Sequence, residues 1–291
     1  MVNGYVCNRN ETIHIDPIHV SFLIQQYGVN IQWGKGLSAG DLSLSEMEAI
    51  SLESMEEVRL MNRLDTKYML SVSRLPEVLQ RVRDHYDVLD IGGRRMATYE
   101  TVYYDWPSGR FFLDHVNGKL TRNKVRIRQY VESRIQFLEI KRKINTGRTK
   151  KIRMRQEEQG TEWSEENLAF LSQYIEGDIR QLHPLMVNRF KRITLVNRGR
   201  SERVTIDVGL SYADLSGTRE EFLPGLAIVE IKQDRFSGSV MKSVLKEMRI
   251  KKCGISKYCL GITLLGLSEK INNYKRKIRT LQKITQNGII A

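Results

Sequence analysis

Cysteine, proline and long apolar runs are scarce in this 291-residue chain, and these shortages exclude several classes of protein. The three cysteines, Cys7, Cys253 and Cys259, are odd in number and lack the close spacing of a zinc site, which argues against a disulfide framework or structural zinc. No apolar run approaches the roughly 20 residues that span a bilayer. The first residues also lack the pattern of a signal peptide. We therefore expect a cytoplasmic protein without a transmembrane segment.

Acidic residues are in the minority. The chain holds 47 Lys and Arg against 34 Asp and Glu, which gives a formal net charge of +13 at pH 7. This balance suits an anionic partner such as a nucleotide, polyphosphate, nucleic acid or lipid headgroup, and charge alone does not choose among them. With 41% hydrophobic residues, the chain is long enough to bury a sizeable core.

A strand-like alternation of cations marks residues 119–130, KLTRNKVRIRQY. Arg122, Lys124, Arg126 and Arg128 occupy every second position there. Such side chains share one face of a strand about 7 Å apart, so neighbours repel by roughly 2–3 kcal/mol at an effective dielectric near 20. The repulsion indicates a negative counterpart. The alternative is an exposed edge strand whose charges prevent aggregation, because such a strand would show the same pattern.

Several later strand-like runs have one charged face and one aliphatic face. The same-face sets are Glu139, Lys141 and Lys143; Arg203, Thr205 and Asp207; and Glu230 and Lys232. Helical spacing interrupts the strands at 73–86, with Ser73 as a predicted cap, and at 164–175 and 237–252. The segment GISKYCLGITLL is predicted to be the last strand. The pattern predicts an α+β fold with a dominant antiparallel sheet. Its charged faces could be exposed to water, or they could equally line a closed antiparallel β-barrel with helices packed outside.

Three parts are expected along the chain: an N-terminal extension at 1–45, a main domain at 46–265 and a basic tail at 266–291. The tail has apolar residues near helical spacing and an excess of Lys and Arg, which predicts a basic amphipathic helix. Packing on the barrel, guidance of polyphosphate and peripheral contact with a membrane surface all remain open for it.

Eight motifs follow one another in the main domain: NRLDTKYML, TVYYDWPSG, HVNGKLTRNKVRIRQY, FLEIKRK, VNRFKR, RVTIDVGL, IVEIKQD and GISKY. Together they resemble the VTC-type polyphosphate polymerase domain of the triphosphate tunnel metalloenzymes, over about residues 48–265. The resemblance implies a tunnel that binds a triphosphate. It also implies transfer of the ATP γ-phosphate to a growing polyphosphate chain with a divalent metal, Mn²⁺ or Mg²⁺.

The resemblance assigns roles to individual residues. The residues expected to bind triphosphate and polyphosphate are Lys67, Arg126, Arg128, Lys141, Lys143, Arg189, Arg203 and Lys257. All of them except Lys143, together with Glu230, make up the expected catalytic set. Glu230 is the expected metal ligand, and Glu139 is a second candidate. Arg and Lys suit phosphate oxygens, and carboxylates suit hard divalent metals.

One departure bears on the branch of the superfamily. Phe137 stands where the wider superfamily has the first Glu of a Glu-x-Glu-x-Lys pattern. This favours the polymerase branch over the triphosphatase and cyclase branch.

Two other functions remain open. A tunnel-type triphosphatase would use the same residues with water as the acceptor, because only the acceptor changes. A non-catalytic polyanion or nucleic-acid binder would show steeply salt-dependent affinity without ATP turnover. The basic strands contain few aromatic residues for base stacking, so we expect ATP and inorganic polyphosphate as partners rather than nucleic acid.

Overall fold

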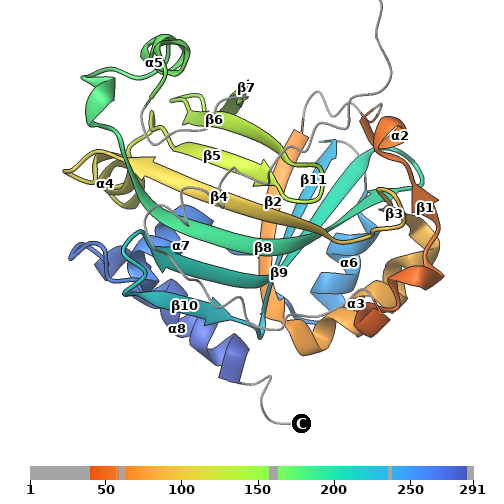
Figure 1. Ribbon diagram of the computed structural model, residues 1–291. Helices are drawn as coiled ribbons and strands as arrows, with labels where there is room; N and C mark the ends of the chain where they lie inside the picture. The colour runs from red at the N-terminus through yellow and green to blue at the C-terminus, as the bar shows by residue number, and fades with distance from the viewer. Residues whose placement is uncertain (1–39, 57, 59–62, 157–162, 235–237, 287–291) are drawn as a thin grey trace, which may run out of the picture.

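The computed structural model of the protein describes residues 40–56, 58, 63–156, 163–234 and 238–286 (Figure 1). Most of the expected N-terminal extension therefore lies outside the described residues. The division of the chain at residues 45 and 265 stays a prediction.

A single large sheet dominates the fold (Figure 1). Its main path runs β2 (Arg63–Ser71), β11 (Leu226–Asp234), β9 (Glu202–Asp214), β8 (His183–Asn197), β4 (Ala97–Asp105), β5 (Val125–Tyr130), β6 (Ile135–Lys143) and β7 (Thr149–Gln156). Every neighbouring pair on this path is antiparallel. The short strands are β1 (Ala49–Ile50), which pairs with β3 (Tyr86–Leu89), and β10 (Glu220–Leu223), which pairs with β9.

The sheet curls but does not close. Its two edges are β2 and β7, and no hydrogen-bonded pairing joins them within the described residues. The α+β class with a large antiparallel sheet is confirmed, whereas the closed barrel is not.

The aliphatic face of the sheet is covered at one end by α3 (Leu75–Val82) and α6 (Val240–Glu247), which lie together in Figure 1. In α3 the buried residues recur at helical spacing, and they pack with residues such as Ile193, Ile206 and Val229 of β8, β9 and β11. Ser73 does not cap α3, because it lies within a 3-10 turn, Val72–Arg74, and its hydroxyl bonds with Ser71.

The expected last strand is instead a helix, α7 (Lys257–Leu264). Ser256 begins this helix, since its Oγ accepts a hydrogen bond from the Cys259 backbone N–H at 3.4 Å. A short run that is apolar all round fits a buried helix as well as a buried strand, which is why its pattern misleads.

The position of α7 also corrects the expectation that the helices pack outside. Its Tyr258 ring packs against Tyr103 of β4 at 5.2 Å between centroids, and Lys257 contacts Asp207 of β9. Tyr103 and Asp207 both lie on the charged face of the sheet, so α7 covers one end of that face.

The remaining helices are shorter or peripheral. They are α2 (Leu52–Glu56), α4 (Arg110–Val116), α5 (Glu165–Ser172) and α8 (Asn272–Gln286), with 3-10 turns at Gly40–Leu42, Leu44–Glu46, Arg83–His85 and Ile179–Gln181. The segment of α4, SGRFFLDHVNGK, has the sequence pattern of a turn. The basic tail forms α8, which packs on β2 and β11. Within the described residues, no helix is long and apolar enough to cross a membrane.

Candidate functional site

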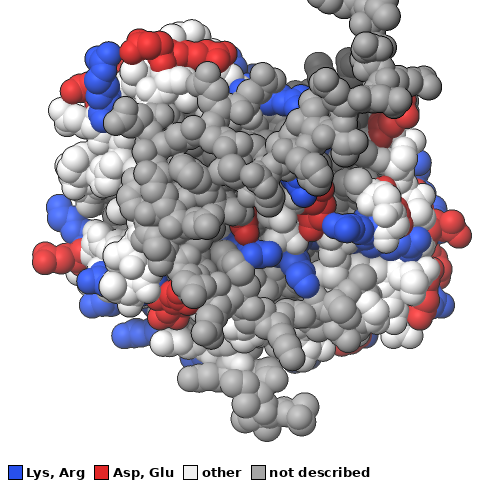
Figure 2. All heavy atoms as spheres, in the orientation of Figure 1, with Lys and Arg blue, Asp and Glu red and all other residues white. Residues whose placement is uncertain are grey.

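Alternate residues of the strands place many charged side chains on one side of the sheet, which we call the cation face. The strand register sets Glu230 between Lys67 of β2 and Thr205 of β9, and it sets Arg126 opposite Glu139. Lys124, just before β5, and Lys257, at the start of α7, also reach this face. The cation face thus comprises three carboxylates, Glu139, Asp207 and Glu230, and the basic residues Lys67, Lys124, Arg126, Arg128, Lys141, Lys151, Arg192, Lys232 and Lys257. Figure 2 shows basic and acidic side chains next to one another near the centre of the view.

Glu230 links the two strands at one side of the cation face. Its Oε1 lies 2.5 Å from Lys67 Nζ, and its Oε2 contacts Lys232. Burial opposes the ionisation of Glu230, but Lys67, Lys232 and Lys141 outweigh it and hold the pKa of this carboxyl well below its usual value. Glu230 is therefore charged throughout the physiological range.

Glu139 of β6 likewise binds two cations from neighbouring strands. Its side chain is 1% exposed, and it lies 2.5 Å from both Arg126 Nη2 and Lys151 Nζ. Burial again opposes its charge, and Arg126, Arg128 and Lys151 together lower its pKa. Arg128 also donates from Nε to Thr101 Oγ1 at 3.2 Å, which fixes its guanidinium on the face.

Asp207 is the third buried carboxylate. Arg192 binds it with two hydrogen bonds, Nε to Oδ1 at 2.6 Å and Nη2 to Oδ2 at 2.9 Å, and Lys257 also contacts Oδ2. Burial opposes its charge, but Arg192 and Lys257 keep the pKa of Asp207 below its usual range.

Two stacked aromatic rings support the cations around Asp207. Tyr99 and Phe190 lie 5.3 Å apart between centroids at an interplanar angle of 5°. The Arg192 guanidinium lies 4.9 Å from the Tyr99 centroid, and Lys257 Nζ lies 4.5 Å from that of Phe190. The rings hold these charges in place without neutralising them.

Several lysines of the face titrate near neutrality. Burial, followed by the charge of Lys67, lowers the pKa of Lys141 to about 7. Burial also lowers the pKa of Lys124 and Lys257 to about 8. The carboxylates thus fall short of neutralising the face, and an anion bound there would restore the charge of these lysines.

Most of the sequence-predicted site residues meet on this face. The structure brings together Lys67, Arg126, Arg128, Lys141, Lys257, Glu139 and Glu230. Lys143 follows Lys141 by two residues on β6, at the end where its backbone pairs with Arg122. Arg203 lies opposite Lys232 at the other end, where it donates to the backbone carbonyls of Met55 and Val58 at 3.4 and 3.2 Å. Lys143 and Arg203 therefore lie at the two ends of the face.

Arg189 does not join the cluster, which corrects its predicted place. It lies on the opposite side of β8, where its Nη1 is 3.1 Å from Glu100 Oε1. Arg189 alternates with Phe190 and Arg192, and it therefore shares the side of Ile193 and Leu195, which pack in the aliphatic core.

Five members of the face were not among the predicted site residues, although strand alternation already placed Lys124, Asp207 and Lys232 on charged faces. They are Lys124, Lys151, Arg192, Asp207 and Lys232. For Arg192 a signal was present, because Ile193 and Leu195 mark the aliphatic side of that strand and leave Arg192 on the other. Asp207 and Lys232 likewise share a strand face with Arg203 and Glu230.

The profile of the VTC domain matches residues 62–266. The chain belongs to the VTC domain family. No curated protein matches the sequence. The match covers the whole cation face, from Lys67 to Lys257.

Three solved structures resemble this VTC domain weakly. The PH1819 protein of Pyrococcus horikoshii OT3 is 13% identical with a TM-score of 0.40, and the match covers 69% of this chain and 96% of that one. The bh2851 protein of Bacillus halodurans is 11% identical with a TM-score of 0.41, and the match covers 67% of this chain and 94% of that one. The HpAC1 protein of Hippeastrum, described as having a dominant triphosphatase activity, is 14% identical at 0.42, over 70% and 96%.

The carboxylates of the VTC domain fit a divalent metal only in part. Among the described residues, no group of three or more His, Cys, Asp or Glu side chains could hold a metal ion. Glu230 and Glu139 are each enclosed by two cations instead. Mg²⁺ commonly binds one or two carboxylates and takes its other ligands from phosphate oxygens and water. A metal that arrives with a triphosphate suits a single carboxylate such as Glu230.

Proposed function

We propose that this VTC domain is an ATP–polyphosphate phosphotransferase that transfers the γ-phosphate of ATP to a growing inorganic polyphosphate chain on the cation face. The family match supports a triphosphate as the substrate class. Phosphoryl transfer asks the protein mainly for positioning and for stabilisation of charge, and no covalent nucleophile is needed. The proposal requires a face that binds polyanions, and it does not require a closed barrel.

The surplus of positive charge on the cation face carries the proposal. Burial and Lys67 depress the pKa of Lys141 to about 7, and Lys124 and Arg126 act in the same direction. A cluster of cations that is partly shielded from solvent is costly unless anions compensate it. A chain of phosphates brings several negative charges in a row, which matches a face built from β2, β5, β6, β8 and β11.

The position of Phe137 supports polymer synthesis over hydrolysis. Phe137 lies opposite Arg128 in the register of β5 and β6, and the Arg153 guanidinium lies 4.5 Å from its ring centroid. A carboxylate at this place would repel phosphate and compete for both guanidiniums. The aromatic ring leaves Arg128 and Arg153 available to a second stretch of phosphates, as a polymeric product requires.

Glu230 is the proposed metal ligand, with Glu139 as the second candidate. The ion, Mn²⁺ or Mg²⁺, would neutralise part of the charge on the transferring phosphoryl group. With the ion bound to Glu230, its two neighbours Lys67 and Lys232 would be able to bind phosphate oxygens instead of this carboxylate. The Arg126 guanidinium is held by Glu139 and is positioned to orient the phosphate chain.

The product of ATP turnover tests the proposal. Purified protein is incubated with ATP and Mn²⁺, and the products are separated by gel and by phosphate assay. We expect a long acid-labile polymer together with ADP. Free orthophosphate alone would assign a triphosphatase, and the absence of turnover would leave a polyanion-binding protein.

Two variants test the site. Arg126→Ala and Glu230→Gln should each lower turnover by at least about 100-fold, since each removes a charge that faces the reacting phosphates. Lys150→Ala is the matched control, because Lys150 is exposed on β7 and alternates with Lys151 of the cation face. Wild-type rates in Arg126→Ala or Glu230→Gln would reject the assignment.

A further inference from the structure

The last helix, α8, carries a row of cations that the cation face does not use. Lys275, Arg279 and Lys283 follow one another at intervals of four residues, and all three are exposed. Residues at this spacing lie above one another on one side of a helix, about 6 Å apart along its axis. Arg276 is exposed beside them, and the fifteen residues of α8 include no Asp or Glu.

This cation row is unfavourable for the helix by itself. Like charges four residues apart destabilise a helix by roughly 0.2–0.5 kcal/mol per pair. The opposite side of α8 packs against the rest of the protein, because Tyr274 and Leu281 on that side are only 2% and 4% exposed. The row is therefore an outward-facing positive surface whose apolar side is not available to a partner.

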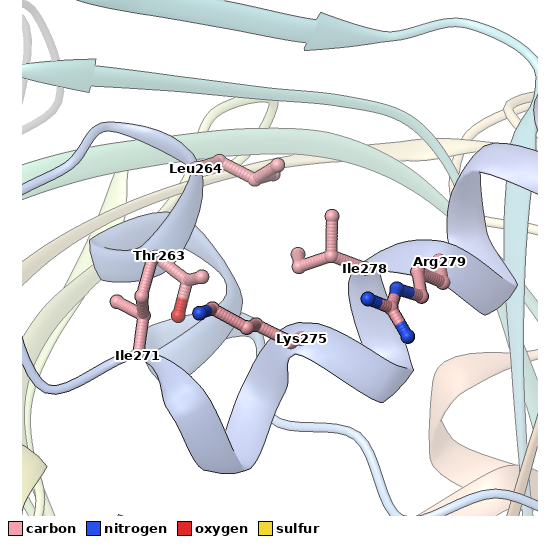
Figure 3. A pocket seen from close by; sticks show the side chains of 6 residues that line it. All are labelled: Thr263, Leu264, Ile271, Lys275, Ile278 and Arg279. Atoms are coloured by element: carbon pink, nitrogen blue, oxygen red, sulfur yellow. The ribbon is translucent and has the colours of Figure 1, made fainter.

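A pocket with apolar walls adjoins the row (Figure 3). Thr263 and Leu264 of α7 line it together with Ile271 and Ile278, and Ile271 lies beside Thr263. Lys275 and Arg279 complete the lining, so two members of the cation row border an apolar depression. Figure 3 shows the Lys275 amino group directed toward Thr263 and the Arg279 guanidinium on the next turn of the helix.

We propose that this surface docks on a membrane of anionic phospholipids, with lipid phosphates at Lys275, Arg279 and Lys283 and the apolar part of one lipid in the pocket. A free polyphosphate chain would match the charges equally well, but it has no apolar part to place against Leu264 and Ile278. Because the apolar side of α8 is buried in the protein, the attachment is electrostatic and shallow. The inference does not rest on the proposed enzymatic function.

Sedimentation with lipid vesicles tests the proposal. The full chain should bind vesicles of phosphatidylcholine mixed with phosphatidylglycerol at low ionic strength, and it should not bind vesicles of phosphatidylcholine alone. A cation near an anionic surface strengthens binding by about fivefold, so the triple variant K275Q/R279Q/K283Q should bind about 100-fold more weakly. The matched control is K150Q/K246Q/R249Q, which removes three exposed cations elsewhere on the molecule and should bind as the wild type does.

Arg279→Glu separates a binding role from a structural one. This variant replaces two repulsive pairs with two attractive ones, so it should unfold at a temperature no lower than the wild type while losing most vesicle binding. A clear fall in its melting temperature would show that Arg279 serves the fold. Equal vesicle binding by the triple variant and the wild type would overturn the proposal. Loss of polyphosphate binding in the triple variant, without any vesicle binding by the wild type, would also overturn it.

Discussion

Lys141 is the group of the cation face whose charge is most sensitive to pH near neutrality, because its pKa is lowered to about 7. Above that pH the folded protein releases the Lys141 proton, whereas the unfolded chain keeps it up to the ordinary lysine value. The free energy of unfolding of the ligand-free protein should therefore rise from pH 7 to pH 9. Polyanion binding should change in the opposite direction, because the ligand favours the charged lysine.

The affinity for tripolyphosphate is the first test at the residue scale. It should fall as the pH rises above 7, by roughly tenfold per pH unit for each lysine that must take up a proton on binding. Calorimetric titration in two buffers of different ionisation enthalpy measures that proton uptake directly. Lys141→Arg stays charged throughout and should flatten the pH dependence. An identical pH profile in this variant would contradict the role given to Lys141.

Asp207 gives a second prediction, which concerns stability. Asp207→Asn leaves Arg192 and Lys257 without their carboxylate, so it should lower the free energy of unfolding by about 3 kcal/mol. Tripolyphosphate should recover a large part of this loss, because it supplies negative charge to the same two cations. Thermal unfolding with and without the ligand measures both effects.

The control for Asp207 is Asp87→Asn. Asp87 lies 3.4 Å from Arg198 at the surface, where an ion pair contributes less than about 1 kcal/mol. The free energy of unfolding should therefore fall only slightly in Asp87→Asn, and tripolyphosphate should not change that fall. A similar response of both variants to tripolyphosphate would show that Asp207 does not hold cations for phosphate.

Sequence alone predicts seven residues that meet on the cation face, and its one misplaced residue has a simple origin. Motif position assigns Arg189, whereas the side to which a strand residue points is set by its packed neighbours. Ile193 and Leu195 are buried against α3 and α6, which directs Arg189 to Glu100 and Arg192 to Asp207. The pairing of Lys257 with Asp207, fifty positions apart, has no local signal in either segment.

At the scale of elements, α7 shows how a tight packing contact positions a charged residue. A Cβ atom on Gly261 would lie 2.6 Å from both Met186 Sδ and Tyr212 Cδ1. The helix can therefore approach β8 and β9 only because this residue lacks a side chain, and Lys257 lies one turn before it. The close approach of α7 thus sets the position of Lys257 over Phe190.

Gly261→Ala tests this dependence. The added methyl group should displace α7, lower stability by about 1–3 kcal/mol and weaken tripolyphosphate binding through Lys257. Gly254→Ala is the matched control, because no atom lies within 4 Å of a Cβ added there. Differential scanning fluorimetry and calorimetric titration give the two readouts. If Gly261→Ala is destabilised but binds tripolyphosphate as tightly as the wild type, the position of α7 does not determine phosphate binding.

Two helices escape prediction, and both are held by contacts between segments that lie far apart in the sequence. Asp105, at the end of β4, accepts hydrogen bonds from the backbone N–H groups of Phe111 and Phe112 and so fixes the start of α4 from outside the helix. The same carboxylate binds the Tyr258 hydroxyl of α7. One aspartate thus joins α4, α7 and the sheet, and no short window of sequence contains this link. The strands, in contrast, follow from alternation within each segment.

For the whole molecule, unbalanced positive charge should dominate the response to ions. Screening reduces the repulsion among the cations, so the melting temperature of the ligand-free protein should rise with ionic strength. A polyanion should act far more strongly at equal ionic strength, since a ligand at 100 times its dissociation constant adds about 2.7 kcal/mol. Thermal unfolding in potassium chloride and in tripolyphosphate compares the two. A melting temperature that falls as potassium chloride is added would contradict the surplus of charge.

The outer edge of the sheet has a consequence for colloidal behaviour. On β7 the side chains of Lys150, Lys151, Arg153 and Arg155 are exposed, and its free edge has no partner strand within the described residues. These like charges repel a second copy that approaches edge to edge, and they therefore oppose aggregation at high protein concentration. A long polyanion would cancel that repulsion and collect several copies along its length, so turbidity should appear at intermediate ratios of polymer to protein and vanish again in excess polymer.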